Sequence, residues 1–153
     1  MSATLEPWYT NLTIWSMVAG WTCAQATKFL VAIIRDRRVD FTFFVSTGGM
    51  PSAHTASVCA LATSAGIREG FASTLFAIAF GFALIVMFDA QSVRRAAGNQ
   101  ARLLNQIVAE LFKEHHLSQE KLAELLGHTR VEVLVGMFFG VLASLLVHGF
   151  WGV

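Results

Sequence analysis

Charged residues are scarce in this chain of 153 residues: 14% are Asp, Glu, Lys or Arg, whereas 55% are hydrophobic. Ordinary soluble domains have about a quarter charged residues, so this composition is typical of an integral membrane protein. The formal net charge is only +1. Such a small overall charge gives no reason to expect a nucleic-acid partner.

Cysteine is also scarce. Cys23 and Cys59 lie in separate apolar segments, so they support neither a disulfide framework nor a zinc site. The N-terminus has no basic region, and no clean small-residue cleavage site follows its apolar run, so we expect no cleavable signal peptide. Internal repeats and low-complexity tracts are absent from the sequence. We expect residues 1–153 to form one domain.

Long apolar segments, by contrast, are plentiful. A helix needs about 20 mostly apolar residues to cross a bilayer. The segments that approach this length are residues 8–34, 51–67, 71–88 and 131–150. The small-xxx-small spacing of Gly136 and Gly140 favours close packing within the chain, with a homodimer as the alternative. We expect an all-α, polytopic membrane helix bundle with about four transmembrane helices.

A polar section, residues 91–129, separates the third and fourth apolar segments. Apolar residues recur there at helical spacing, which predicts an amphipathic helix that continues the third segment. These residues are Val93, Ala97, Leu104, Ile107, Val108 and Leu111. A second, short helix is predicted from Ser118 to Gly127.

Basic residues are concentrated in two of the connections between the apolar segments. The positive-inside rule places those two connections, and with them the amphipathic segment, in the cytoplasm. Both termini are then expected outside. The residues that decide this are Arg35, Arg37, Arg38, Arg94, Arg95, Arg102, Lys113, Lys121 and Arg130, against Arg68 on the other side.

The second apolar segment begins with a motif suited to binding anions. Residues 46–54 read Ser-Thr-Gly-Gly-Met-Pro-Ser-Ala-His. Glycine permits a tight turn and proline suits the first position of a helix, so we expect a helix to start at Pro51. Free amides and the helix dipole attract negative charge at such an end. Ser52 and His54 would lie beside them.

Four alternating spans bring several charged residues to this same face of the membrane. Charged groups at membrane depth are costly and usually functional. The residues that converge are Lys28, Arg35, Ser52, His54, Asp89, Arg94, Arg95, His128 and Glu132. Taken singly, each has an ordinary reading: Lys28 could snorkel, Asp89 could pair with Arg94 or Arg95, and the basic residues could simply flank helices.

His128 and Glu132 lie four residues apart, where a carboxylate can hold one imidazole nitrogen and leave the other free for attack. Lys28 and Arg35 lie seven apart, two helical turns, and could both bind one phosphate. His54 could protonate a departing oxygen. A simple surface pair of His128 with Glu132 is the plain alternative.

These motifs resemble those of the type 2 phosphatidic acid phosphatase superfamily, which includes vanadium haloperoxidases, and in particular its small divergent branch. The resemblance to the superfamily rests on Lys28 with Arg35, on Pro51-Ser52-Ala53-His54, and on His128 with Glu132. The resemblance to the branch rests on residues 47–56, 88–98 and 124–129. It implies that His128 is a nucleophile oriented by Glu132, that His54 is a general acid, and that no metal or other cofactor is needed. The Ser-Arg pair that the family has upstream of its nucleophile is absent, so Arg94 or Arg95 is expected to supply the guanidinium.

The resulting expectation is an enzyme of the inner or plasma membrane of a bacterium, with its site facing the cytoplasm. It would hydrolyse a lipid phosphate, such as phosphatidate, phosphatidylglycerophosphate or a polyprenyl phosphate, through a phosphohistidine. Two alternatives remain open. One is an inactive membrane protein that binds anionic headgroups or acts as an assembly subunit. The other is a metal-dependent hydrolase that uses Asp89, Glu132 and the histidines.

Overall fold

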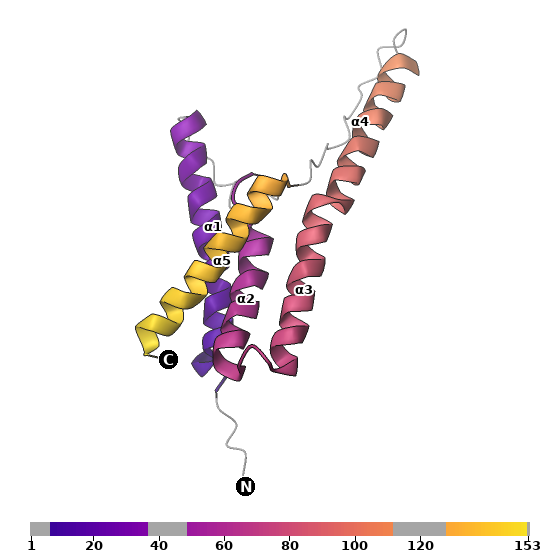
Figure 1. Ribbon diagram of the computed structural model, residues 1–153. Coiled ribbons are helices and arrows are strands. Elements are labelled where there is room, and N and C mark those ends of the chain that lie inside the picture. The colour runs from indigo at the N-terminus through magenta and orange to yellow at the C-terminus, as the bar shows by residue number, and fades with distance from the viewer. Residues whose placement is uncertain (1–6, 37–48, 112–127, 153) are drawn as a thin grey trace.

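The structure is a computed structural model that describes residues 7–36, 49–111 and 128–152. Within these ranges it is all-α, as predicted (Figure 1). A short 3-10 turn, η1 (Trp8–Thr10), precedes the long helix α1 (Leu12–Asp36). The remaining helices are α2 (Ala53–Glu69), α3 (Thr74–Gln91), α4 (Val93–Leu111) and α5 (Arg130–Trp151).

Three of the described helices are long and apolar enough to cross a membrane, namely α1 as far as Ile34, α3 and α5. The chain is therefore an integral membrane protein with at least these three candidate spans. The remaining segment that we expected to cross, α2, has only 17 residues, or about 25 Å of helix. It lies among α1, α3 and α5 and contacts all three (Figure 1).

The helix α2 forms the centre of the bundle. Nine of its 17 residues are buried, and these are mostly small: Ala53, Thr55, Ala56, Val58, Cys59, Ala60, Ala62, Ser64 and Gly66. The helix α3, in contrast, buries only Ala83 and Ala90 and exposes large apolar side chains. Protein therefore surrounds α2, whereas α3 offers most of its surface to lipid.

Small residues let α1 and α5 approach α2 closely. A Cβ added to Gly136 would lie 2.6 Å from the carbonyl oxygen of Ser52, and one added to Gly20 would lie 2.9 Å from that of Ala56. One added to Gly140 would also meet the Ala56 carbonyl. We call Gly20, Ala56, Gly136 and Gly140 the small-residue seam. The predicted spacing of Gly136 and Gly140 thus serves packing within the chain, and a homodimer stays a prediction.

The seam contacts also give the helix directions. Residues 136 and 140 of α5 meet residues 52–59 of α2 in the same order, so these helices are parallel, and α1 runs antiparallel to both. At the far end of the bundle, Ser64 Oγ lies 2.8 Å from Nε2 of His148 and 3.0 Å from Oγ1 of Thr13. A chain of polar contacts, buried at Ser64 and His148 and partly buried at Thr13, therefore links α1, α2 and α5 there. This contact was not among the sequence-based expectations.

The amphipathic helix predicted after the third span is present as α4. It follows α3 with Ser92 between them and extends away from the other helices (Figure 1). Among the described elements, α4 contacts only α3, and its Leu104 and Ile107 are exposed. The short helix predicted from Ser118 to Gly127 lies outside the described residues.

Candidate functional site

The turn before α2 shapes one wall of the candidate site. Gly49 has φ +89°, a conformation that glycine adopts readily. Ser52 is the N-cap of α2, and its Oγ accepts from the backbone N–H of Thr55 at 3.4 Å and from Thr55 Oγ1 at 3.1 Å. The expectation that Pro51 is the first helical residue was wrong, because Ser52 caps the helix and Ala53 begins it.

The predicted pair of His128 and Glu132 lies on either side of the N-cap of α5. Nδ1 of His128 lies 2.8 Å from Oε2 of Glu132. The same oxygen accepts the backbone N–H of Thr129 at 3.1 Å, while Thr129 Oγ1 accepts from Glu132 N at 3.3 Å. This is a capping box, so the carboxylate that holds the imidazole is itself fixed by the helix start. The Thr-x-x-Glu pattern that announces it was readable in the sequence but was overlooked.

The other nitrogen of His128 has no such partner. His128 is only 4% exposed, and its Nε2 is buried with no hydrogen-bond partner among the described residues. A buried, unpaired polar atom costs stability and calls for an explanation. In the tautomer whose Nδ1–H donates a hydrogen bond to the carboxylate, Nε2 carries the lone pair. It is therefore available to a ligand.

Two backbone hydrogen bonds bring three helix ends to this imidazole. Ser52 N donates to the carbonyl of Glu132 at 3.1 Å, which joins the start of α2 to the start of α5. His128 N donates to the carbonyl of Ala90 at 3.0 Å, which joins the end of α3. Asp89 therefore lies at the same end of the bundle, with its side chain exposed. The convergence of these ends matches the sequence-based expectation.

Lys28 comes to the same place from α1. Ala24, one turn earlier, packs against Ala53 and Ala56, so Lys28 lies level with the turn before α2. Its side chain is 6% exposed, and the charge of Glu132 acts on it. A buried ammonium is costly unless a negative group compensates for it. Glu132 supplies part of that compensation.

Three other predicted residues are located only by their backbone. Arg35 lies in α1 two turns beyond Lys28, or about 10 Å further along the axis. Arg94 and Arg95 lie in the first turn of α4, beside the end of α3. The side chains of all three lie outside the described part of the structure. Their contact with a ligand stays a prediction.

His54 is the second residue of α2, and its side chain is exposed. Since Ser52 bonds to Glu132, the chain places His54 and His128 at the same end of the bundle. Ser52, by contrast, already uses its hydroxyl for Thr55 and its amide for Glu132. Its described contacts are those of a helix cap and an interhelical joint.

A metal centre would need several ligands close together. Within residues 7–36, 49–111 and 128–152, no group of three or more His, Cys, Asp or Glu side chains is arranged to hold a metal ion. At this end of the bundle the described basic side chains include Lys28, which is buried, and Arg130, which is exposed.

The chain was compared with known protein families and with individual relatives. The model of the divergent PAP2 family matches residues 9–143, which include every candidate site residue. The chain belongs to the divergent PAP2 family. It is also 39% identical, over 153 residues, to the uncharacterized membrane protein YuiD of Bacillus subtilis (strain 168), with 93% of this chain and 97% of that protein covered. No solved structure matches it significantly.

Proposed function

We propose that the chain is a membrane phosphatase that hydrolyses a lipid phosphate through a phosphohistidine on His128. The observation that carries the proposal is the arrangement of this imidazole: Nδ1 lies 2.8 Å from Glu132, and Nε2 is buried without a hydrogen-bond partner among the described residues. A nucleophile oriented by an adjacent carboxylate is the arrangement that covalent catalysis requires. Membership of the divergent PAP2 family supports the same chemistry.

In the first step, Nε2 attacks the phosphorus atom, an N–P bond forms and the ester P–O bond breaks. His54, as an imidazolium, gives its proton to the departing lipid alkoxide. In the second step, His54 takes a proton from water as the water oxygen attacks phosphorus. The N–P bond then breaks, and inorganic phosphate and neutral His128 are released.

Basic side chains neutralise the phosphate during both steps. Lys28 would act as a buried point charge, and Arg35 with Arg94 or Arg95 would supply planar guanidinium groups. The Glu132 charge would stabilise the imidazolium-like character that develops on His128. Asp89, at the end of α3, would orient one of the arginines.

The position of the site supports a substrate that is anchored in the membrane. His128 lies directly before an apolar helix of 22 residues, so the imidazole lies at the end of a candidate span rather than in its middle. A phosphate attached to a lipid anchor reaches that depth without leaving the membrane. Phosphatidate, phosphatidylglycerophosphate and polyprenyl phosphates all meet this description, and we propose that the site faces the cytoplasm of a bacterial cell.

The test is phosphate release by the purified full-length protein from these lipids, with and without a chelator. We expect chelator-resistant turnover that orthovanadate inhibits and that His128→Ala abolishes. The control is Ser73→Ala, which alters the cap of α3 at the opposite end of the bundle. Turnover that the chelator abolishes would support a metal-dependent hydrolase. Lipid binding without turnover on any substrate would support a headgroup-binding protein and overturn the proposal.

A further inference from the structure

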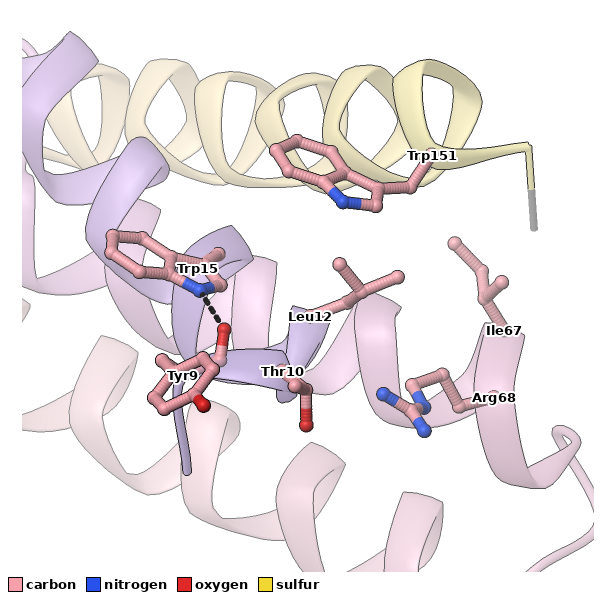
Figure 2. A pocket seen from close by; sticks show the side chains of 7 residues that line it. All are labelled: Tyr9, Thr10, Leu12, Trp15, Ile67, Arg68 and Trp151. Carbon is pink, nitrogen blue, oxygen red and sulfur yellow. Dashed lines mark hydrogen bonds between the residues drawn. The ribbon is translucent and has the colours of Figure 1, made fainter. Parts of the chain in front are cut away.

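A cavity of about 600 Å³ lies at the end of the bundle opposite to His128. We call it the Arg68 pocket (Figure 2). Its walls come from η1, the start of α1, the end of α2 and the end of α5. They are formed by Tyr9, Thr10, Leu12, Trp15, Ile67, Arg68 and Trp151. Its size is within the range of sites that bind small organic ligands, about 300 to 1,000 Å³.

One wall of this pocket is held in place before any ligand arrives. The indole Nε1 of Trp15 donates to the carbonyl of Tyr9 at 2.7 Å, as Figure 2 shows, and Thr10 Oγ1 donates to the carbonyl of Pro7 at 2.7 Å. These bonds fold η1 back against the first turn of α1. A ligand would therefore meet a preformed wall, which lowers the entropic cost of binding.

The pocket combines one cation with apolar surface. Among the described residues that line the pocket, Arg68 is the one that is charged, and none of them is a carboxylate. Its apolar surface in Figure 2 comes from Leu12, Ile67 and the indoles of Trp15 and Trp151, while Tyr9 and Thr10 complete the lining. A guanidinium binds phosphate or carboxylate through paired N–H groups. The complementary ligand has an anionic group joined to an apolar portion.

The aromatic residues around the pocket indicate that such a ligand would be a membrane lipid. Trp8, Tyr9, Trp15 and Trp151 are all at least 41% exposed and gather at this end of the bundle. Exposed tryptophan and tyrosine are enriched where the hydrocarbon core meets the headgroups. We propose that the Arg68 pocket binds an anionic lipid of the leaflet opposite to the His128 site, with its phosphate on Arg68 and an acyl chain between Trp15 and Trp151. This site is separate from the proposed phosphatase site.

The experiment uses the purified full-length protein in neutral detergent and measures its thermal unfolding against added lipid. Phosphatidylglycerol is compared with phosphatidylcholine of the same acyl chains and with inorganic phosphate. We expect saturable stabilisation by phosphatidylglycerol alone. Arg68→Gln should weaken the apparent affinity for phosphatidylglycerol by about tenfold or more, because a charge-assisted hydrogen bond to phosphate is lost.

A matched pair of variants tests the apolar wall. Trp15 and Trp21 lie on α1 with exposed fractions of 41% and 42%, but only Trp15 lines the pocket. Trp15→Leu should weaken phosphatidylglycerol binding, whereas Trp21→Leu should leave it unchanged. Equal loss in both variants, or unchanged affinity in Arg68→Gln, would show that these residues are only interfacial anchors. Equal stabilisation by inorganic phosphate would overturn the assignment to a lipid.

Discussion

One carboxylate oxygen of Glu132 holds both the imidazole of His128, at 2.8 Å, and the backbone N–H of Thr129, at 3.1 Å. The group that orients the candidate nucleophile is thus also part of the cap of α5. A cap fixes the carboxylate without help from any flexible loop. The orientation of the imidazole is consequently tied to the first turn of α5, which His128 precedes by two residues.

Glu132→Gln separates these two roles. An amide oxygen can still accept the Thr129 N–H, so we expect the stability to fall by no more than about 1 kcal/mol. The negative charge beside His128 is lost, so turnover should fall by roughly 10² to 10⁴, as when other catalytic histidines lose a carboxylate. Phosphate release and thermal unfolding measure the two effects. A variant with normal turnover would contradict the role given to Glu132.

Ser52 and Ser73 offer a comparison of two helix caps. Each accepts an N–H of its own helix, but Ser52 is fully buried and also accepts the hydroxyl of Thr55. Ser73→Ala should cost about 1 kcal/mol. Ser52→Ala should cost about 2 to 3 kcal/mol, because it also leaves a buried donor unpaired. Chemical unfolding in mixed detergent measures both, and equal losses would show that the Thr55 contact contributes nothing.

The small-residue seam should tolerate no added methyl group. Gly140→Ala places a Cβ against the Ala56 carbonyl, which is backbone and cannot rotate away, so we expect a loss of about 1 to 3 kcal/mol. Gly81→Ala is the control, since no heavy atom lies within 4 Å of its added Cβ. It should be neutral or stabilise by up to about 1 kcal/mol. Thermal unfolding measures the stability of both variants. Unchanged stability in Gly140→Ala would contradict the close packing of α5 against α2.

The sidedness of the His128 site is open to cysteine labelling. In a background without Cys23 and Cys59, a cysteine is placed at Glu69, at the end of α2, or at Arg130, at the start of α5. We expect an impermeant maleimide to label Glu69→Cys in intact cells. Arg130→Cys should react only after the membrane is permeabilised. The reverse pattern would place the His128 site outside.

Local spacing predicted which of these residues would lie close together. His128 and Glu132 are four residues apart, and their side chains are in contact although His128 precedes the N-cap of α5. The positions of Lys28 and Asp89 followed from the order of the apolar segments, because alternating helices return to the same face. These predictions needed no knowledge of which side chains touch across the bundle.

The contacts between different helices could not be predicted from the spacing of residues along the chain. The bond from Ser52 N to the Glu132 carbonyl and the pairing of Ser64 with His148 both depend on the register of α2 against α5. That register is set by how far Gly136 and Gly140 allow the helices to approach. Composition indicates that close approach is possible, but it does not say which residues then face each other.

The central position of α2 has a consequence for biosynthesis. Its polar and small residues, Ser52, Thr55 and Ser64 among them, are covered chiefly by α1 and α5. During translation α5 emerges last, so one flank of α2 faces lipid until then. We expect α2 to enter the bilayer as a hairpin with the strongly apolar α3, and the nascent chain to stay a substrate for quality-control proteases until α5 is inserted.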